Sequence, residues 1–315
     1  MNAAFAPAVF IGDVALDEYF SASEWVRPGN KALIETLASY VGGSIANAAR
    51  VHAKLGGDTE FISLLNRGAL TARILETLAE EHVGAEHMLY DDEVGDQRNF
   101  IFLVEGEHVV LTPDVDERPM RLSAASFDAL ASPGYLYTTL DRAARLRSGE
   151  LGAAQVLQVL RDAGRRVVFD LDVDGLREGD TELLRGAHLV MMNDRGFEHS
   201  FGAHGTDAEV RAWLRSEGID VLLRSQAAAG ATSYTLDKTI TTPGYEVPVV
   251  DVTGAGDTLG GALVWALGSG MALEQAVQFA VAAASRSVMH MGPTGGVAEE
   301  SAVRSFAAER GMALA

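Results

Sequence analysis

The sequence predicts an α/β fold with a parallel central sheet flanked by helices and a small β-sheet lid. From about residue 135 onward, short apolar or β-branched runs alternate with longer stretches of helical periodicity, which is the pattern of successive β-α-β units. Before that point, strand-like segments occur that no crossover helix follows. No linker, low-complexity segment or repeat divides the 315 residues, so we expect one domain over residues 1–315.

The expected core strands are short and apolar, and helical stretches separate them. The stretches 151–163 and 207–217 have a period near 3.6, which fits crossover helices. A strand-like run at 246–250 precedes a glycine-rich turn and an apolar helix that reaches about Leu267. The other expected core strands are residues 9–12, 135–140, 166–171, 188–193 and 220–225.

The lid is expected to come from two excursions of the chain. Residues 13–40 look irregular, whereas residues 99–105 and 108–111 form a hairpin around Gly106. These excursions could pair as a small sheet of their own. We therefore expect the lid to comprise about residues 13–41 and 96–113.

Composition excludes several classes of function. Asp and Glu total 44 against 25 Lys and Arg, a formal charge of −19 that would repel nucleic acid and anionic membranes. The absence of cysteine excludes disulfides, thiolate metal sites and cysteine nucleophiles. The start of the chain has no basic leader, and no apolar run is long enough to span a membrane. We expect a soluble cytoplasmic protein without nucleic-acid or membrane partners.

The strongest local signal is the turn Asp251-Val-Thr-Gly-Ala-Gly-Asp257. Glycines before a helix let backbone N–H groups converge, and the helix N-terminus adds positive potential, so residues 254–256 can hold phosphate oxygens or a developing anion. Asp257 then lies where a carboxylate can orient or deprotonate an attacking hydroxyl group. The alternative is that Asp257 only caps the helix. The motif matches neither the Gly-x-x-x-x-Gly-Lys-Ser/Thr phosphate loop nor a complete Gly-x-Gly-x-x-Gly dinucleotide turn.

A second glycine pair, Gly42-Gly43, leads into a helix that Gly56 ends. Asn47 lies in its first turn among alanine and isoleucine, where its amide needs a hydrogen-bond partner. That partner is either a bound hydroxyl group or the neighbouring loop backbone.

Together, these two segments resemble the two signatures of the ribokinase-like (PfkB-type) carbohydrate kinase family, in the right order along nearly the whole chain. The resemblance implies a ribokinase-like α/β domain with a β lid, ATP and Mg²⁺ as cofactors, and a homodimer formed through the lid. It also implies transfer of the γ-phosphoryl group of ATP to a hydroxyl of a sugar, keto-sugar acid or nucleoside, with Asp257 as the base and residues Gly254, Ala255 and Gly256 as the anion hole.

The resemblance further implies an acceptor site near the start of the chain. Asp13 and Asp17 would hold sugar hydroxyls, with Gly42, Gly43 and Asn47 beside them. Because the two acids are four residues apart, they share a face of an extended segment. The alternative is two solvated acids in a lid loop.

The implied nucleotide site lies in the second half of the chain. Asn193 matches an asparagine that lies near the triphosphate, and Ser225, Ala227 and Gly230 fall where a Thr-x-Gly-x-x-Gly loop is usual. Three features depart from the family pattern: Gly196 stands where an acid is expected, with Glu198 nearby; Ala227 replaces the loop glycine; and residues 65–70 lack the usual Gly-Asp-Asp. These departures put the Mg²⁺ contact and the nucleotide pose in question.

Other residues offer metal ligands. Asp251 and Thr253, with backbone near residues 291–296, correspond to a monovalent cation site, such as one for K⁺, in some family members. The acids Asp170, Asp172 and Asp174 leave a strand and could bind a metal, although acids in this pattern are usually solvated or cap the next turn.

Two rivals remain from other functional classes. A catalytically silent sugar- or nucleotide-binding protein on the same fold would explain Gly196 and Ala227, but the intact Asp257 argues against it. A dinucleotide-dependent oxidoreductase is the weaker rival, because it would need a glycine turn near the start of the chain and an acidic ribose ligand about twenty residues later, and the sequence has neither. The acceptor is not named by the sequence, although Lys31 and Arg98 in the lid could meet a carboxylate or phosphate on it.

Overall fold

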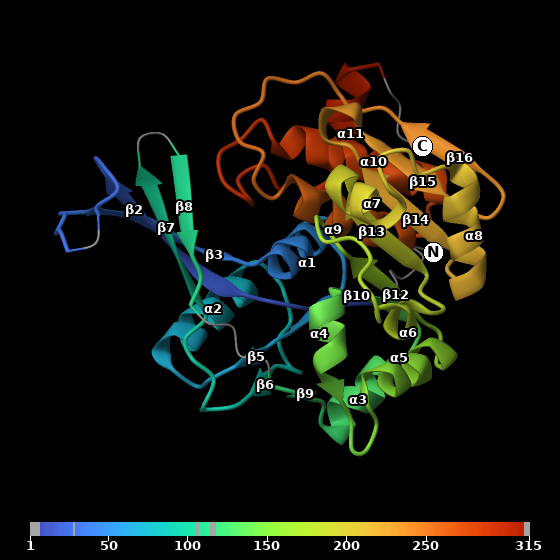
Figure 1. Ribbon diagram of the computed structural model, residues 1–315, viewed down its shortest axis with the longest axis horizontal. Coiled ribbons are helices and arrows are strands. Elements are labelled where there is room, and N and C mark those ends of the chain that lie inside the picture. Colours follow the sequence, from blue (N-terminus) through green and yellow to red (C-terminus); the bar gives the residue numbers. More distant parts are fainter. Residues whose placement is uncertain (1–6, 28, 105–106, 114–117, 312–315) are drawn as a thin grey trace.

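The computed structural model describes residues 7–27, 29–104, 107–113 and 118–311, and it consists of an α/β body from which a smaller sheet projects (Figure 1). The body is built on an eight-stranded sheet in the order β16-β15-β14-β13-β12-β10-β1-β4. The strands from β14 to β4 are parallel, and β15 and β16 add two antiparallel strands at one edge. The strands are β1 (Ala8–Ile11), β4 (Thr59–Ile62), β10 (Gly134–Thr138), β12 (Arg165–Asp170), β13 (Leu189–Asn193), β14 (Val221–Ser225), β15 (Ala231–Tyr234) and β16 (Thr239–Thr242).

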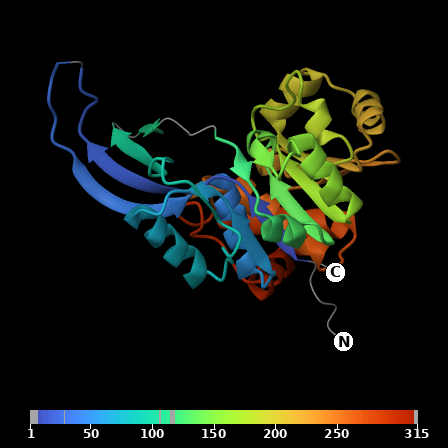
Figure 2. The same ribbon diagram turned by 90° about the horizontal axis from the view of Figure 1, so that it is seen from below.

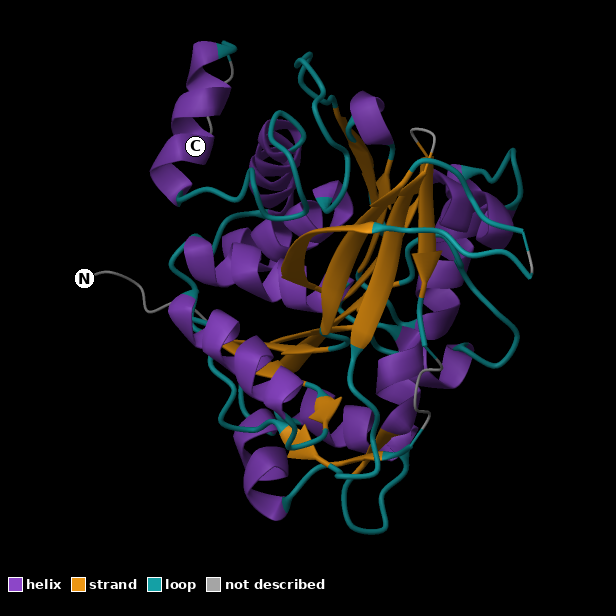
Figure 3. Cartoon of the chain, turned by 90° about the vertical axis from the view of Figure 1, so that its left-hand side faces the viewer, coloured by secondary structure: helices purple, strands orange, loops and turns teal. Residues whose placement is uncertain are grey.

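Helices cover both faces of this sheet (Figure 3). Alternate residues of β1 belong to two different core clusters, Ala8 and Phe10 to one and Val9 and Ile11 to the other, as expected for a strand buried on both faces. One face is covered by α1 (Ser44–Lys54), α2 (Ala69–Glu80), α9 (Ala255–Gly268), α10 (Leu273–Ser287) and α11 (Glu300–Glu309). The other is covered by α3 (Ala124–Leu130), α4 (Leu140–Arg145), α5 (Ala153–Asp162), α6 (Thr181–Leu184), α7 (Asp194–Phe201) and α8 (Asp207–Glu217).

The projecting sheet, which we call the lid sheet, has the strand order β3-β2-β7-β8. It extends away from the body in both Figure 1 and Figure 2. The strands β2 and β7 are parallel, and each pairs antiparallel with its outer neighbour. The lid strands are β2 (Ala15–Ala22), β3 (Glu35–Gly42), β7 (Arg98–Val104) and β8 (Glu107–Leu111).

Short pairs and turns complete the chain. Two small parallel pairs, β5 with β6 and β9 with β11, lie between the larger elements, and a 3₁₀ turn follows β14. Among the described residues, no helix is both long and apolar enough to cross a bilayer. The bounds of these elements are β5 (Leu64–Leu65), β6 (Leu89–Tyr90), β9 (Met120–Arg121), β11 (Leu146–Arg147) and η1 (Ala227–Ala229).

Two expectations from the sequence were wrong. Residues 13–40 are not irregular, because they contain most of the eight-residue strands β2 and β3, whose largely exposed or half-exposed side chains hide the strand pattern. Residues 246–250 form no strand; instead, the Val250 N–H donates to the Val288 carbonyl at the end of α10, and the Val249 side chain remains 62% exposed. The turn expected around Gly106 lies outside the described residues.

Candidate active site

The glycine-rich turn opens α9 as a helix N-terminus facing a cavity. Gly254 is the N-cap residue and has φ 76°, a left-handed conformation that favours glycine. A Cβ at this position would lie 2.4 Å from the Pro293 carbonyl oxygen, so the turn also requires the absence of a side chain. The first N–H groups of a helix have no acceptor within the helix. In this turn the Ala255 N–H donates to the Val252 carbonyl oxygen at 3.2 Å, so an anion would meet the other N–H groups of the first turn.

Asp257 lies in the first turn of α9 but is not its N-cap, because Gly254 holds that position. Its Oδ2 atom accepts a hydrogen bond of 2.9 Å from the Asn47 amide of α1. These two residues are 210 positions apart, so the fold alone brings the two glycine signatures together. The alternative that Asp257 only caps the helix does not describe this geometry.

The surroundings of Asp257 bring the pKa of its carboxyl group close to neutral pH. Burial raises the pKa of its carboxyl group to about 7, and the negative charges of Asp170 and Asp172 act in the same direction. Hydrogen bonds from Asn47 and Ser44 oppose this shift because they stabilise the carboxylate. A carboxyl group with such a pKa suits a general base, which works best when its pKa lies near the working pH.

A cavity of about 290 Å³ lies against Asp257, at the carboxyl ends of the parallel strands. Ligand sites of open α/β sheets occur at this edge. The cavity brings together residues that were predicted from both ends of the chain. Its polar lining residues are Asp13, Ser44, Thr139, Asp170, Asp172, Asn193, Ser225 and Asp257.

On the lid side, Asp17 of β2 is held by a chain of hydrogen bonds. The Asn99 amide donates to Asp17 Oδ1 at 2.7 Å, and the Thr112 hydroxyl donates to Asn99 Oδ1 at 2.8 Å. Burial raises the pKa of Asp17. The end of β3 lies against this carboxylate, since a Cβ on Gly42 would be 2.0 Å from Asp17 Oδ2.

Asp17 is a residue of β2, whereas Asp13 lies before that strand, so the two acids do not belong to one strand. Asp13 precedes β2 and forms an ion pair with Arg142 of α4. Burial raises the pKa of Asp13, and the Arg142 guanidinium partly opposes the shift. Gly43 is the N-cap residue of α1.

On the nucleotide side, Asn193 ends β13 and caps α7. Its Oδ1 atom accepts from the Gly196 N–H at 3.0 Å, and its amide nitrogen donates to Asp172 Oδ1 at 2.8 Å. A Cβ on Gly196 would lie 2.2 Å from the Asp172 carbonyl oxygen, so an acid does not fit at position 196. The carboxylate beside Asn193 is instead that of Asp172, which is exposed, as expected for an acid that leaves a strand.

The loop after β14 contains the other three predicted nucleotide residues. Ser225 ends the strand and lines the cavity, whereas Ala227 begins the 3₁₀ turn that Gly230 ends. Ala227 has φ 47°, a left-handed conformation in which glycine is less strained. The position where glycine is usual thus keeps a glycine-like backbone.

The predicted cation residues lie beside the anion turn. Asp251 accepts backbone N–H groups from Thr253 and Gly292, each at 2.9 Å, and so ties the turn to the loop before α11. Within the described part of the chain, no group of three or more His, Asp or Glu side chains could hold a metal ion. Any cation here would therefore depend on backbone carbonyls, phosphates or water for most of its ligands.

Sequence reasoning missed the role of Asp170. It accepts a hydrogen bond of 2.7 Å from the buried Tyr137 hydroxyl, and burial raises its pKa to about 6. Its place at the end of a predicted parallel strand, on the same edge as Asn193, was the signal that could have identified it. Asp174, in contrast, is exposed, as expected.

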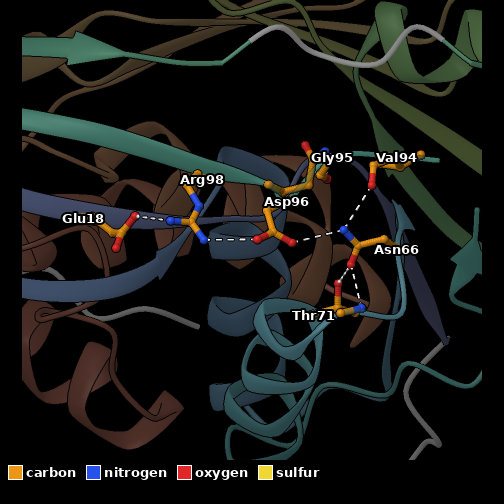
Figure 4. Close-up of polar contacts among 9 residues, drawn as sticks. Glu18, Asn66, Thr71, Val94, Gly95, Asp96 and Arg98 are labelled. Atoms are coloured by element: carbon orange, nitrogen blue, oxygen red, sulfur yellow. Dashed lines mark hydrogen bonds and ion pairs between the residues drawn. The ribbon is translucent and has the colours of Figure 1, made fainter. Parts of the chain in front are cut away.

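Arg98 does not offer an uncompensated charge to an anionic acceptor. Figure 4 shows it between Glu18 of β2 and Asp96, with salt bridges of 3.2 and 3.1 Å. Asp96 in turn accepts from Asn66, whose amide also donates to the Val94 carbonyl. This network connects the lid sheet to the segment that precedes α2.

The sequence is similar to a known family and to several curated proteins. The family described as pfkB family carbohydrate kinase matches residues 8–300. The chain is 30% identical to the bifunctional protein HldE of Azorhizobium caulinodans over 91% of its own length, and 25% identical to the ribokinase of Haemophilus influenzae over 90%. It covers 92% of that ribokinase but only about 60% of the HldE proteins that it matches.

Solved structures show the same fold. A ribokinase of Arabidopsis thaliana, complexed with ribose and ATP, superposes with a TM-score of 0.82, covering 96% of this chain and 98% of that one at 21% identity. Phosphofructokinase-2 of Escherichia coli, in complex with potassium, gives a TM-score of 0.74, covering 98% and 99% at 20% identity.

Proposed function

Because the chain belongs to the pfkB family of carbohydrate kinases, we propose that it transfers the γ-phosphoryl group of ATP to a hydroxyl group of a small sugar-like substrate. The observation that carries this proposal is the Asp257 carboxylate, which lies in the first turn of α9, at a helix N-terminus suited to an anion, and lines a cavity. Base, anion hole and cavity are the parts that phosphoryl transfer needs.

In the proposed reaction, Asp257 accepts the proton of the acceptor hydroxyl as its oxygen attacks the γ-phosphorus. The bond from that phosphorus to the bridging oxygen breaks, and ADP leaves. The N–H groups around Gly254, Ala255 and Gly256 stabilise the charge on the phosphoryl oxygens. The first turn of a helix is suited to this task because its N–H groups are fixed before the reaction begins.

The acceptor site would lie between the body and the lid sheet, where Asp13, Asp17 and Asn47 accept or donate hydrogen bonds to hydroxyl groups beside Gly42 and Gly43. A neutral sugar fits this surface better than a sugar acid or sugar phosphate. The acids Asp170, Asp172 and Asp257 line the same cavity as Asp13, and an anionic acceptor would be repelled by them. The basic residues Arg98 and Arg142 are already paired with acids.

ATP would occupy the part of the cavity near Asn193, Ser225, Ala227 and Gly230. Mg²⁺ prefers oxygen ligands and usually keeps several waters, so the Asp172 carboxylate beside Asn193 suits it as a partner. Mg²⁺ would neutralise charge that develops on the phosphates.

A monovalent cation such as K⁺ would lie near Asp251 and Thr253, where a carboxylate meets the backbone of residues 291–296.

We further propose one domain over residues 1–315, with the lid at about 13–41 and 96–113, in a cytoplasmic homodimer formed through the lid sheet. Several large apolar side chains of the lid are exposed in the single chain, and a second copy could cover them. They include Trp25 (51%), Leu33 (97%), Leu37 (40%) and Val110 (55%).

The test is a screen for ADP formation from ATP and Mg²⁺ against neutral sugars, keto-sugar acids and nucleosides. Turnover that depends on an acceptor supports the proposal, and neutral sugars should give the highest kcat/KM. Binding of nucleotide or sugar without turnover would instead favour the catalytically silent protein that Gly196 and Ala227 first raised as an alternative.

A further inference from the structure

Arg50 is a buried charge in the middle of α1, one helical turn after Asn47. Its side chain is 8% exposed and forms an ion pair with Glu81, the C-cap residue of α2. One guanidinium nitrogen, Nη1, donates to the Val41 carbonyl of β3 at 2.8 Å and lies 3.4 Å from Asn47 Oδ1. Arg50 therefore contacts the end of a lid strand and the residue that hydrogen-bonds to Asp257.

These contacts fix which way the Asn47 amide faces. A guanidinium group can only donate hydrogen bonds, so the Asn47 oxygen must face Arg50. The amide nitrogen then faces Asp257 and donates to its carboxylate at 2.9 Å. If the amide turned over, its nitrogen would face the donors of Arg50 and its oxygen would face the Asp257 carboxylate. Both contacts would be repulsive.

The direction of the amide matters because the other charges near Asp257 favour its protonated form. Burial raises the pKa of Asp257, and the hydrogen bond from Asn47 is a principal influence in the opposite direction. A turned amide would accept a hydrogen bond from the protonated acid and would stabilise the form that cannot take a proton. The groups that face Asp257 are Asp170 and Asp172 from β12 and its following loop, Tyr137 from β10, Ser44 and Asn47 from α1, and Asp13 across the cavity, which pairs with Arg142 of α4.

We propose that Arg50 is a positioning residue for phosphoryl transfer: by holding the Asn47 oxygen, it fixes the Asn47 amide as a hydrogen-bond donor to the Asp257 carboxylate. This inference rests on the proposed function of Asp257 as the base. Arg50 is not among the residues that line the cavity, and it acts through Asn47.

The experiment compares pH profiles of kcat/KM for the acceptor, at saturating ATP, in wild type and three variants. Arg50→Met and Arg50→Gln lose the donor-only group, so the acidic limb of the pH profile should move up by about one pH unit. A shift of this size corresponds to the loss of about one hydrogen bond to a charged group. Activity at pH 6 should then fall about tenfold, whereas activity at pH 9 should change less than about twofold. Arg50→Lys keeps a donor-only cation and should restore most of the wild-type profile.

Glu81→Gln is the matched control. It weakens the ion pair, of which the Glu81 side is 37% exposed, but keeps Arg50 and its contact with Asn47, so its acidic limb should not move up. Arg50→Gln keeps a polar side chain of similar length, so it carries the test if Arg50→Met does not fold. If these two Arg50 variants melt at lower temperature but keep the wild-type limb, Arg50 is purely structural and the proposal is wrong.

A titration of Asp257 by carbon NMR, assigned with Asp257→Asn, separates this inference from the proposed function. Wild type without phosphotransferase activity would overturn the proposed function, yet the NMR titration would still report whether Arg50→Gln raises the Asp257 pKa. In an Asn47→Ala background, Arg50→Gln should cause no further shift. An equal shift with and without Asn47 would show that Arg50 does not act through the amide.

Discussion

Replacing Asp17 by alanine should weaken use of the acceptor much more than use of ATP. Asp17 is the acid of the lid sheet that Asn99 and Thr112 orient and against which Gly42 packs. Losing a hydrogen bond to a charged group costs about 1.5–3 kcal/mol. At about 1.4 kcal/mol per tenfold change, kcat/KM for the acceptor should fall roughly 10-fold to 150-fold. The KM for ATP should change less than about twofold.

The neighbouring residue supplies the matched control for this prediction. Glu18 is also an acid of β2, but successive side chains of a strand point to opposite faces, and Glu18 pairs with Arg98. A partly exposed ion pair of this kind contributes about 0–1 kcal/mol, so Glu18→Ala should change kcat/KM for the acceptor less than about fivefold. The assay is steady-state ADP release with each substrate varied in turn. Equal losses in the two variants, or equal losses for acceptor and ATP in Asp17→Ala, would refute the placement of Asp17 at the acceptor.

Two further predictions concern stability. Burial lowers the pKa of His52 from 6.5 to about 3, so the unfolded chain binds a proton that the folded protein excludes, and stability should fall by up to about 1.4 kcal/mol for each pH unit between pH 6.5 and pH 3. The free energy of unfolding, measured by urea unfolding at several pH values, should depend less steeply on pH in His52→Gln than in wild type. An equally steep pH dependence in the two proteins would contradict this origin. Ala227→Gly should raise the free energy of unfolding by about 0.5–1 kcal/mol, because relief of the left-handed strain exceeds the added entropy of the unfolded chain. A lower urea midpoint in this variant would show that the alanine is not strained.

The parts of the fold that the sequence predicted are those with a strong burial pattern. Strands such as β12 and β13 are buried on both faces, so their apolar runs are unmistakable. The lid strands β2 and β3 have mostly exposed or half-exposed side chains, and they lack that signal. At Val249 and Val250 the error was the opposite one: the sequence predicted a strand where the structure has none. A strand-like composition does not supply a neighbouring strand with which to pair.

The candidate site divides in a similar way. Backbone features with a local cause, such as the turn at Gly254, could be expected from sequence spacing alone. Contacts between distant parts of the chain could not be expected in this way, because nothing local predicts that Asn47 donates to Asp257 or that Arg50 pairs with Glu81. The Asp172 backbone fills the space beside Gly196, and this contact also depends on how the ends of two strands meet.

The central claim is that Asp257 acts as the base, and Asp257→Asn tests it most directly. Asparagine has nearly the same shape and can still accept the hydrogen bond from Asn47, so the variant should melt at or above the wild-type temperature and should bind ATP at least as well. It cannot take a proton. Turnover should therefore fall by roughly 10²–10⁴, the usual contribution of a positioned general base. A variant that melts normally and keeps more than about a third of wild-type turnover would contradict the claim, because that loss is well under 1 kcal/mol of barrier.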